Sequence, residues 1–241
     1  MQELLKPIKS ESLKEVCIAR FEELILSGKL TVGQKLPAER QLALQLGVSR
    51  PIVHEGLVDL AAKGLVTMKP RIGTLVNDFR KEGSLSLLTS LLNYHQGRLD
   101  THLLKSLLDM RMLFEVETAR LAALHRRVEH LQAFDQLLKA EKAVSFDHTE
   151  KITELDFDFH HLIALATDNS IYPLLLNSFK QFYFNLAGLF FSDPAVISEV
   201  FEFHQKMVHA IEENDALQAA AIMKEMLAHG ELHLKAVIEQ D

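Results

Sequence analysis

The sequence of 241 residues contains no tryptophan, a single cysteine, and only 10 glycines and 6 prolines. So few glycines and prolines do not suit the many tight turns of an all-β sandwich or barrel. The single cysteine, Cys17, excludes an internal disulfide, and we expect it to pack as an ordinary apolar residue. Because 48% of the residues are hydrophobic, the chain can form sizeable cores. We therefore predict a mainly α-helical protein.

Long apolar segments are also missing. No run of residues is long enough to cross a bilayer, and the opening stretch MQELLKPIKSESLKEV lacks the apolar centre of a secretory signal. We therefore expect no membrane partner and a cytoplasmic location. The length of the chain suits two modest domains, and we place the boundary between residues 1–79 and residues 80–241.

Charge and histidine are distributed unevenly between these parts. Residues 1–80 have a net charge of +3 and the remainder has −10, which together give the −7 of the whole chain. Of the 12 histidines, only His54 lies in the first eighty residues. A weakly basic first part indicates an anionic partner such as nucleic acid.

The first eighty residues show the pattern of a winged helix-turn-helix with a small β-hairpin. Helices are predicted over 12–27, over 38–46 before Gly47, and over 50–63 after Ser49 as N-cap. The segments LVTM and TLVN are β-prone and flank the turn KPRIG. In this fold the first turn of the third helix enters the major groove of double-stranded DNA.

The first turn of the third helix and the hairpin tip therefore hold the candidates for DNA contact. Arg50 can bind guanine through two hydrogen bonds, while Pro51 and Ile52 can contact thymine methyl groups. The remaining candidates are Ser49, His54, Lys69, Arg71 and Gly73. The alternative is a winged helix that binds another protein.

The segment GKLTVGQKLPAERQLALQLGVSRPIVHEGLVDLAAKGLV, followed by KPRIGTLV, resembles the DNA-binding domain of the GntR family of bacterial regulators over about residues 10–77. The resemblance implies that operator DNA is contacted by Arg40, Ser49, Arg50, Ile52, Arg71, Gly73 and Thr74. The chain departs from the family pattern at His54, where Arg is usual, and at Gly56, where Ala is usual. His54 removes a fixed positive charge, and Gly56 costs up to about 1 kcal/mol of helix stability relative to Ala.

The second part has helical spacing throughout and no strand pattern. We predict an antiparallel bundle of six to seven helices, with ligand sites formed by side chains that face inward. The predicted helices span residues 84–95, 99–126, 129–145, 150–167, 170–191, 195–213 and 216–239.

One of these helices, in the stretch ELDFDFHHLIALA, carries Asp156 and His160 on one face beside a strongly apolar face. Such a pair can contribute two ligands to a metal ion. The alternative is that Asp156 and His160 hydrogen-bond to each other in a polar patch of the bundle.

The segments LLDMRMLFEVETARLAAL, LDFDFHHLIALATDNSIY and FEFHQKMVHAIEENDALQAAAIMKEM resemble the FCD-type ligand-binding domain of the FadR subgroup of that family over about residues 85–238. The resemblance implies a divalent metal held by Asp156, His160, His204 and a later histidine. Met226 stands at the expected fourth position, so His229, about one turn further on, is our candidate. Zinc, nickel, manganese and iron all suit such a ligand set.

Arg111 is the candidate for effector binding. In the related domains this arginine faces the cavity, where it can hold a carboxylate through two hydrogen bonds. The alternative is an ion pair with Glu115, which lies four residues further along the same helix.

The sequence thus predicts a homodimeric, metabolite-responsive transcriptional regulator, a repressor released by a small carboxylate such as a sugar acid or hydroxy acid. One alternative is a fatty-acyl-CoA-responsive regulator without metal, because NSIYPLLLNSFKQFYFNLAGLFFSDPA also resembles the regulator for which the subgroup is named. A remote alternative is a helical metalloenzyme. No nucleophile or acid–base partner is placed by spacing, so we expect that the protein is not an enzyme.

Overall fold

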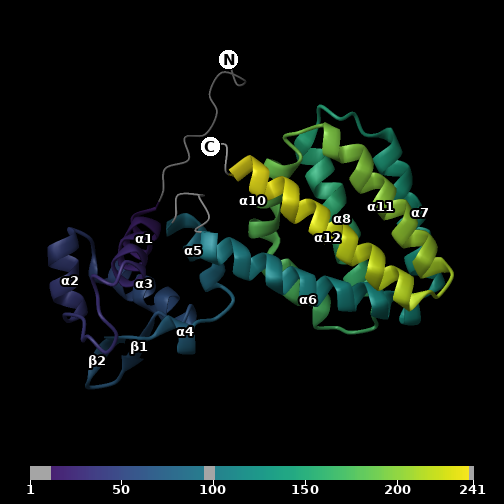
Figure 1. Cartoon of the computed structure of the whole chain (residues 1–241). Coiled ribbons are helices and arrows are strands. Elements are labelled where there is room, and N and C mark those ends of the chain that lie inside the picture. The colour runs from purple at the N-terminus through teal and green to yellow at the C-terminus, as the bar shows by residue number, and fades with distance from the viewer. Residues whose placement is uncertain (1–11, 95–100, 239–241) are drawn as a thin grey trace, which may run out of the picture. The chain divides into compact units, whose positions relative to one another are not determined.

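The computed structural model describes residues 12–94 and 101–238, and the chain divides into two compact units (Figure 1). Unit 1 spans residues 1–98 and unit 2 spans residues 99–241. The ends of predicted helices at residues 95, 99–100 and 239 lie outside the described residues. Within the described ranges, no helix is long and apolar enough to span a membrane.

Unit 1 has the predicted order of elements. It contains α1 (Leu13–Leu26), α2 (Glu39–Leu46), α3 (Arg50–Ala62), β1 (Val66–Lys69), β2 (Gly73–Val76), α4 (Phe79–Glu82) and α5 (Leu87–Tyr94). The two strands are antiparallel, with Val66 opposite Val76 and Lys69 opposite Gly73. The winged helix-turn-helix and its hairpin are therefore confirmed.

Local signals explain where these elements begin and end. Ser12 and Glu15 form a reciprocal capping box at the start of α1. Gly47, with φ 67°, ends α2 in the left-handed conformation that glycine adopts without steric cost. Ser49 occupies the N-cap position of α3, but its side chain makes no capping hydrogen bond. The Ser49 hydroxyl therefore accepts no hydrogen bond from the backbone of α3.

Helix α5 packs on α1, although the predicted domain boundary places it in the second domain. Its Leu87 is buried in the core of unit 1. The side chain of Ser90 donates to Glu22 Oε1 at 2.7 Å, and Lys63 Nζ lies 2.5 Å from the same oxygen. The predicted first domain ends at residue 79, whereas the compact unit ends at residue 98. The segment between these two positions carries α5 and most of α4.

Unit 2 is a helical bundle, as predicted. Its described helices are α6 (Thr101–His125), α7 (Val128–Ala143), α8 (Thr149–Ala166), α9 (Tyr172–Ser178), α10 (Lys180–Phe190), α11 (Ala195–Glu212) and α12 (Ala216–Ile238). The long helices α6 and α12 lie side by side (Figure 1). The prediction of one continuous helix over 170–191 is wrong, because the backbone at Phe179 (φ −96°, ψ 0°) separates α9 from α10.

Helix α8 is the most enclosed element of unit 2, since α6, α7, α9 and α10 all pack against it. Phe159 and Ile163 face one apolar cluster, whereas Phe157 and Ala164 face another. At 3.6 residues per turn, Asp156 and His160 fall on the arc between these two apolar faces. Both side chains are consequently buried inside the bundle.

Candidate functional site

Unit 1 carries a concave surface between the start of α2, the start of α3 and the hairpin. Cationic side chains dominate its lining: Lys35, Arg40, Arg50, Lys69 and Arg71. Glu39, the first residue of α2, is the acidic side chain in this lining. We call this surface the cationic groove. Several cations around one concavity give the electrostatic footprint of a surface that binds nucleic acid.

Most of the predicted DNA contacts reach solvent on or beside this groove. Arg40, Arg50, Pro51, His54 and Arg71 are exposed, and the Arg50 side chain has 71% of its surface accessible. Ser49, at the N-cap of α3, is exposed as well. Ile52 is partly buried and packs against the core of unit 1, which limits the surface that it can offer to a base.

The hairpin tip has a special backbone. Arg71 has φ 66° and Gly73 has φ 113°, both in the left-handed half of conformational space. A Cβ atom at Gly73 would lie 3.1 Å from Lys35 Cε, so glycine also leaves room for the Lys35 side chain beside the hairpin tip. Thr74 is buried but still belongs to the lining of the groove, and its backbone carbonyl accepts a hydrogen bond from Leu36 N.

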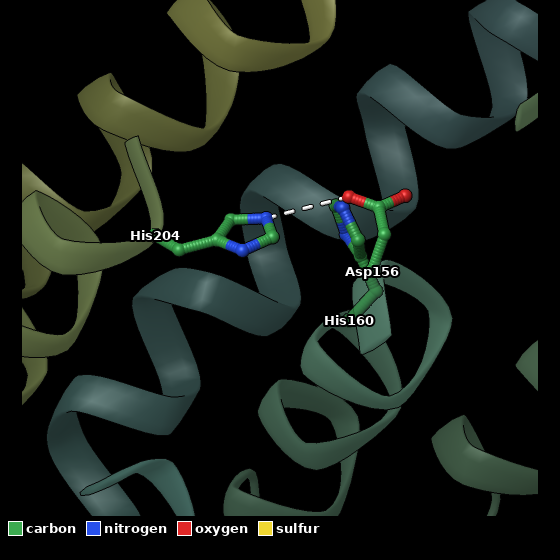
Figure 2. A group of neighbouring side chains, drawn as sticks. All are labelled: Asp156, His160 and His204. Atoms are coloured by element: carbon green, nitrogen blue, oxygen red, sulfur yellow. Dashed lines mark ion pairs between the residues drawn. The ribbon is translucent and has the colours of Figure 1, made fainter. Parts of the chain in front are cut away.

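Unit 2 brings together three of the four predicted metal ligands. Asp156, His160 and His204 each offer one ligand atom, and these atoms lie within 4.8 Å of one another (Figure 2). His204 comes from α11, and its Nε2 points at Asp156 Oδ1 at 3.4 Å. The Phe159 ring stacks on the His204 ring with 3.7 Å between the centroids. Helix packing therefore fixes the orientation of this imidazole.

A buried carboxylate holds the other ring nitrogen of each histidine. His204 Nδ1 lies 2.7 Å from Glu141 Oε1 of α7, and His160 Nδ1 contacts Glu115 Oε2 of α6. Histidines that bind metal are commonly oriented in this way, with one nitrogen on a carboxylate and the other on the ion. His204 Nε2 is thereby directed at Asp156, and Nε2 of His160 is not engaged by Glu115.

Asp156 is held as an ionised group. The Tyr183 hydroxyl donates to Asp156 Oδ2. Burial alone would raise the pKa of the Asp156 carboxyl, but His204, His160 and Tyr183 together lower it. Burial would likewise lower the pKa of His204, but Asp156 and Glu141 raise it to about 9. The cluster thus stabilises charge on both partners despite its burial.

The cluster has more buried carboxylates than fixed cations. Asp156, Glu115 and Glu141 carry three negative charges, and Arg111 supplies one positive charge. The remaining two negative charges can be balanced either by two protonated imidazoles or by one divalent cation. In the described residues, four atoms of the cluster are buried without a hydrogen-bond partner: His204 Nε2, Glu141 Oε2, His160 Nδ1 and Glu115 Oε2, the last two in contact as an ion pair. The donor set and its unsatisfied atoms therefore fit a divalent cation.

His229 does not join this cluster. Its Nε2 lies 3.2 Å from Glu199 Oε2 of α11, and its ring lies 4.2 Å from the His233 ring, centroid to centroid. Met226, one turn earlier on α12, instead lines the cavity beside Asp156 and His160. Asp156 and His160 therefore belong both to the three-residue cluster and to the lining of this cavity.

That cavity has a volume of about 60 Å³, several times the ~10–15 Å³ that one water molecule requires. One end is polar and is formed by Arg111, Asp156, His160 and Tyr183. Apart from Gly230 and the acidic Glu231, the rest of the lining is apolar: Leu108, Met112, Leu186, Ala187, Phe190, Val200, Met226, Leu227 and Leu234. A second small cavity, on α6, α9 and α10, shares Arg111 and Tyr183 as its wall.

Arg111 makes the ion pair with Glu115 and also lines the cavity. Its Nε donates to Glu115 Oε1 at 2.6 Å, so the ion pair within α6 is present. Its guanidinium also lies over the Tyr183 ring, 4.9 Å from the centroid. A quarter of the Arg111 side chain stays accessible, and Arg111 lines both cavities. The terminal nitrogens can therefore still receive an anionic group.

Sequence reasoning did not assign Glu141 or Tyr183 to this site, and it considered Glu115 only as a partner of Arg111. A signal for two of them exists in the apolar spacing. Glu141 follows Phe134 by seven residues, and Glu115 lies on the same stripe of α6 as Leu108 and Ala119. A carboxylate on an apolar stripe is expensive to bury and therefore points to a buried partner.

The comparisons with known proteins cover both units. The model described as "Bacterial regulatory proteins, gntR family" matches residues 13–76, and the model described as "FadR C-terminal domain" matches residues 77–237. "HTH-type transcriptional regulator Mce2R" of Mycobacterium tuberculosis is 31% identical over 235 residues, which cover 97% of this chain and 96% of that protein. "Fatty acid metabolism regulator protein" of Yersinia pestis is 30% identical over 200 residues, 83% of this chain and 81% of that one.

A solved structure shares the fold. Lar of Listeria monocytogenes has a TM-score of 0.60 at 17% identity, and the match covers 95% of this chain and 99% of that chain. At this identity the similarity concerns the arrangement of helices and hairpin alone.

Proposed function

The chain belongs to the GntR family of bacterial regulatory proteins and has a C-terminal domain of the FadR type, and we propose that it is a repressor released by a small carboxylate at a metal centre in unit 2. Its relatives are named transcriptional regulators. The chain is accordingly an effector-responsive DNA-binding regulator and not an enzyme, which removes the metalloenzyme alternative.

The DNA-binding role is assigned to the cationic groove. Arg50 and His54 at the start of α3 and Arg71 in the hairpin are the exposed groups best placed for base and phosphate contacts. One winged helix offers little base-contacting surface, and proteins of this fold commonly read two half-sites with two copies. We therefore propose a homodimer on a two-fold symmetric operator. Light scattering in the micromolar range tests this, and a monomer that still binds operator tightly would refute it.

The single observation that carries the metal proposal is the paired histidine arrangement. His204 has Nδ1 on Glu141 and Nε2 directed at Asp156, and His160, with Nδ1 on Glu115, lies in the same buried cluster. Zinc, nickel, manganese or iron bound by Asp156, His160 and His204 would supply positive charge and an open position for a carboxylate oxygen. Arg111 and Tyr183 at the same end of the cavity would bind the rest of that acid.

A second ligand class is favoured by the apolar wall of the cavity. Most of its lining is aliphatic or aromatic, and the second cavity beyond Arg111 and Tyr183 is almost entirely apolar, with Phe114, Phe179 and Phe182. The Yersinia relative is named for fatty acid metabolism. A fatty acid or fatty acyl-CoA would place its apolar chain along these walls, and it would not need a metal.

One screen distinguishes these ligands. The melting temperature of the full chain is measured with sugar acids, hydroxy acids, fatty acids or acyl-CoAs, each in the presence of zinc, of nickel or of a chelator. Compounds that raise the melting temperature are then tested for release of the chain from operator DNA. We expect a small carboxylate to raise the melting temperature only with metal and to weaken operator binding by a coupling of about 1–3 kcal/mol. Stabilisation by an acyl compound in chelator supports the second class, and no hit in either assay would contradict the sensor role.

The variant His160→Ala gives the sharpest control. It should remove both the metal dependence and the ligand response, because one metal ligand and the partner of Glu115 are lost. Operator binding without ligand should remain, since the cationic groove belongs to unit 1. A His160→Ala variant that still responds to ligand and metal would contradict the metal centre.

A further inference from the structure

One carboxylate lies within the cationic groove, where it should repel DNA phosphates. Glu39 is the first residue of α2 and shares the groove lining with Lys35, Arg40, Arg50, Lys69 and Arg71. A like charge that faces the phosphate backbone weakens binding to any DNA sequence. The contacts of Glu39 offer a reason why a carboxylate at this position can nevertheless help recognition.

The two oxygens of Glu39 are divided between two residues of the next helix. Oε2 accepts from Arg50 Nε at 3.0 Å, and Oε1 lies 2.7 Å from His54 Nδ1. The Glu39 side chain is only 21% accessible, whereas those of Arg50 and His54 are 71% and 54% accessible. The carboxylate therefore lies beneath two side chains that extend outward from α3.

The contacts also determine which nitrogen atoms remain free. The hydrogen bonds with His54 and Arg50 lower the pKa of Glu39, so this group is an ionised acceptor. Because an ionised carboxylate can only accept, His54 Nδ1 must carry the proton that it shares with Glu39. Among the described residues, no hydrogen bond or ion pair engages His54 Nε2 or the two terminal nitrogens of Arg50. Two parallel terminal nitrogens match guanine O6 and N7.

We propose that Glu39 is a positioning residue for operator recognition, which pre-orients Arg50 and His54 of α3 without touching DNA itself. The proposal rests on the assignment of Arg50 to base contact. A free arginine side chain samples many rotamers, and ordering it upon binding lowers affinity. Glu39, on a different helix from Arg50, orders that side chain before DNA arrives. The benefit applies to the specific complex only, because non-specific DNA does not require one Arg50 rotamer.

Glu39→Gln tests this proposal, with a duplex selected by the wild-type chain from a randomised pool. Affinity for that duplex should fall roughly 3–10-fold, the effect of losing one pre-ordered side chain. Preference should relax at the base pair that Arg50→Ala also affects. Affinity for unrelated DNA should stay equal or rise, since a negative charge is removed. These opposite signs separate positioning from a loss of folding, which would weaken both complexes.

Glu55→Gln is the matched control. Glu55 is an exposed acid on α3 and has no hydrogen bond or ion pair with another described residue. Its neutralisation removes the same charge from unit 1, so it should affect unrelated DNA as Glu39→Gln does, without loss of sequence preference. If both variants behave alike on the selected duplex, Glu39 acts by charge alone and the proposal is wrong.

The double variant Glu39→Gln/Arg50→Ala distinguishes positioning from direct base reading. If Glu39 acts through its neighbours, the Gln substitution should change no base preference once Arg50 is absent. If Glu39 instead accepts a hydrogen bond from cytosine N4, Glu39→Gln should relax the preference at that base pair both with Arg50 and with Arg50→Ala. That outcome would overturn the proposal and leave the DNA-binding function intact. Failure of the wild-type chain to select any duplex would count against the function itself.

Discussion

The charged groups around the cationic groove are stabilised by water as well as by ion pairs, whereas those of the buried cluster are stabilised by other side chains. In the groove, Arg50 and His54 are largely exposed, and water shares in their solvation. In unit 2, His160 and His204 are enclosed, and each has a carboxylate partner on another helix. Exposed ion pairs contribute little to stability, whereas breaking a buried pair is costly. The two regions should therefore respond to mutation in opposite ways.

The largest difference should appear when one buried carboxylate is removed. Glu115→Ala leaves Arg111 and His160 without their shared acceptor, and unit 2 should lose about 3–5 kcal/mol of unfolding free energy. Glu117→Ala, on the same helix, removes an exposed partner of Arg120 and should change stability by less than about 0.5 kcal/mol. Urea denaturation measures both, and equal effects would remove the distinction between buried and exposed charges.

The groove should show the reverse behaviour, with binding affected and stability unaffected. Arg50→Ala should weaken the selected duplex by about 1–3 kcal/mol and relax preference at one base pair. Its unfolding free energy should change by less than about 0.5 kcal/mol, because the side chain is exposed. Arg120→Ala, which removes a half-buried arginine of unit 2, should leave DNA binding unchanged. Uniform weakening on all DNA sequences would instead make Arg50 a phosphate contact.

The buried cluster should also couple metal binding to pH. Burial lowers the pKa of His204 but Asp156 and Glu141 raise it to about 9 in the metal-free chain, above the ordinary 6.5. This raised pKa stabilises the metal-free fold below about pH 6.5, and the contribution is lost as the pH rises toward 9. A metal must displace the proton, so zinc affinity should rise about tenfold per pH unit between pH 7 and 9.

Calorimetric zinc titrations in two buffers of different ionisation enthalpy measure that proton release. His125→Gln, which alters an exposed histidine at the end of α6, should leave the zinc affinity and its pH dependence unchanged. His204→Gln should abolish both. A zinc affinity that does not vary with pH would show that zinc does not displace a proton from His204.

The smallest effect concerns a glycine that faces the cavity. Gly230 lies within α12, and a Cβ atom there would meet no other atom within 4 Å. Gly230→Ala should stabilise the helix by up to about 1 kcal/mol but weaken a ligand that fills the cavity. Gly188→Ala is the matched control, because Gly188 is also helical with open space around it and does not line that cavity. Equal ligand affinity in both variants would mean that the ligand lies elsewhere.

Unit 1 was predictable because its signals are local. Ser12, Gly47 and Gly73 mark helix and hairpin ends within a few residues of the features that they control. The pairing of Asp156 and His160 follows from helical spacing alone. By contrast, the partners of the histidines come from helices distant in sequence. Which acids reach them depends on how α6, α7 and α11 pack around α8. That packing cannot be predicted from the residues of any one helix.

His229 illustrates the same limit. The resemblance to the family made it the candidate for the fourth ligand because Met226 stands at the expected position, yet α12 directs it toward Glu199. A difference of one turn along a helix is about 5.4 Å, which exceeds any metal–ligand distance. The break between α9 and α10 is equally hidden, because the apolar pattern continues through Phe179.

The most direct test of the account is anomalous diffraction from crystals of the full chain soaked in zinc or nickel, measured at the absorption edge of the metal. The account predicts one peak in unit 2, bound by Asp156 and by Nε2 of both His160 and His204, with Glu115 and Glu141 still on Nδ1. A peak between His229, His233 and Glu199 would contradict it. So would the absence of any peak while His204 Nε2 still faces Asp156.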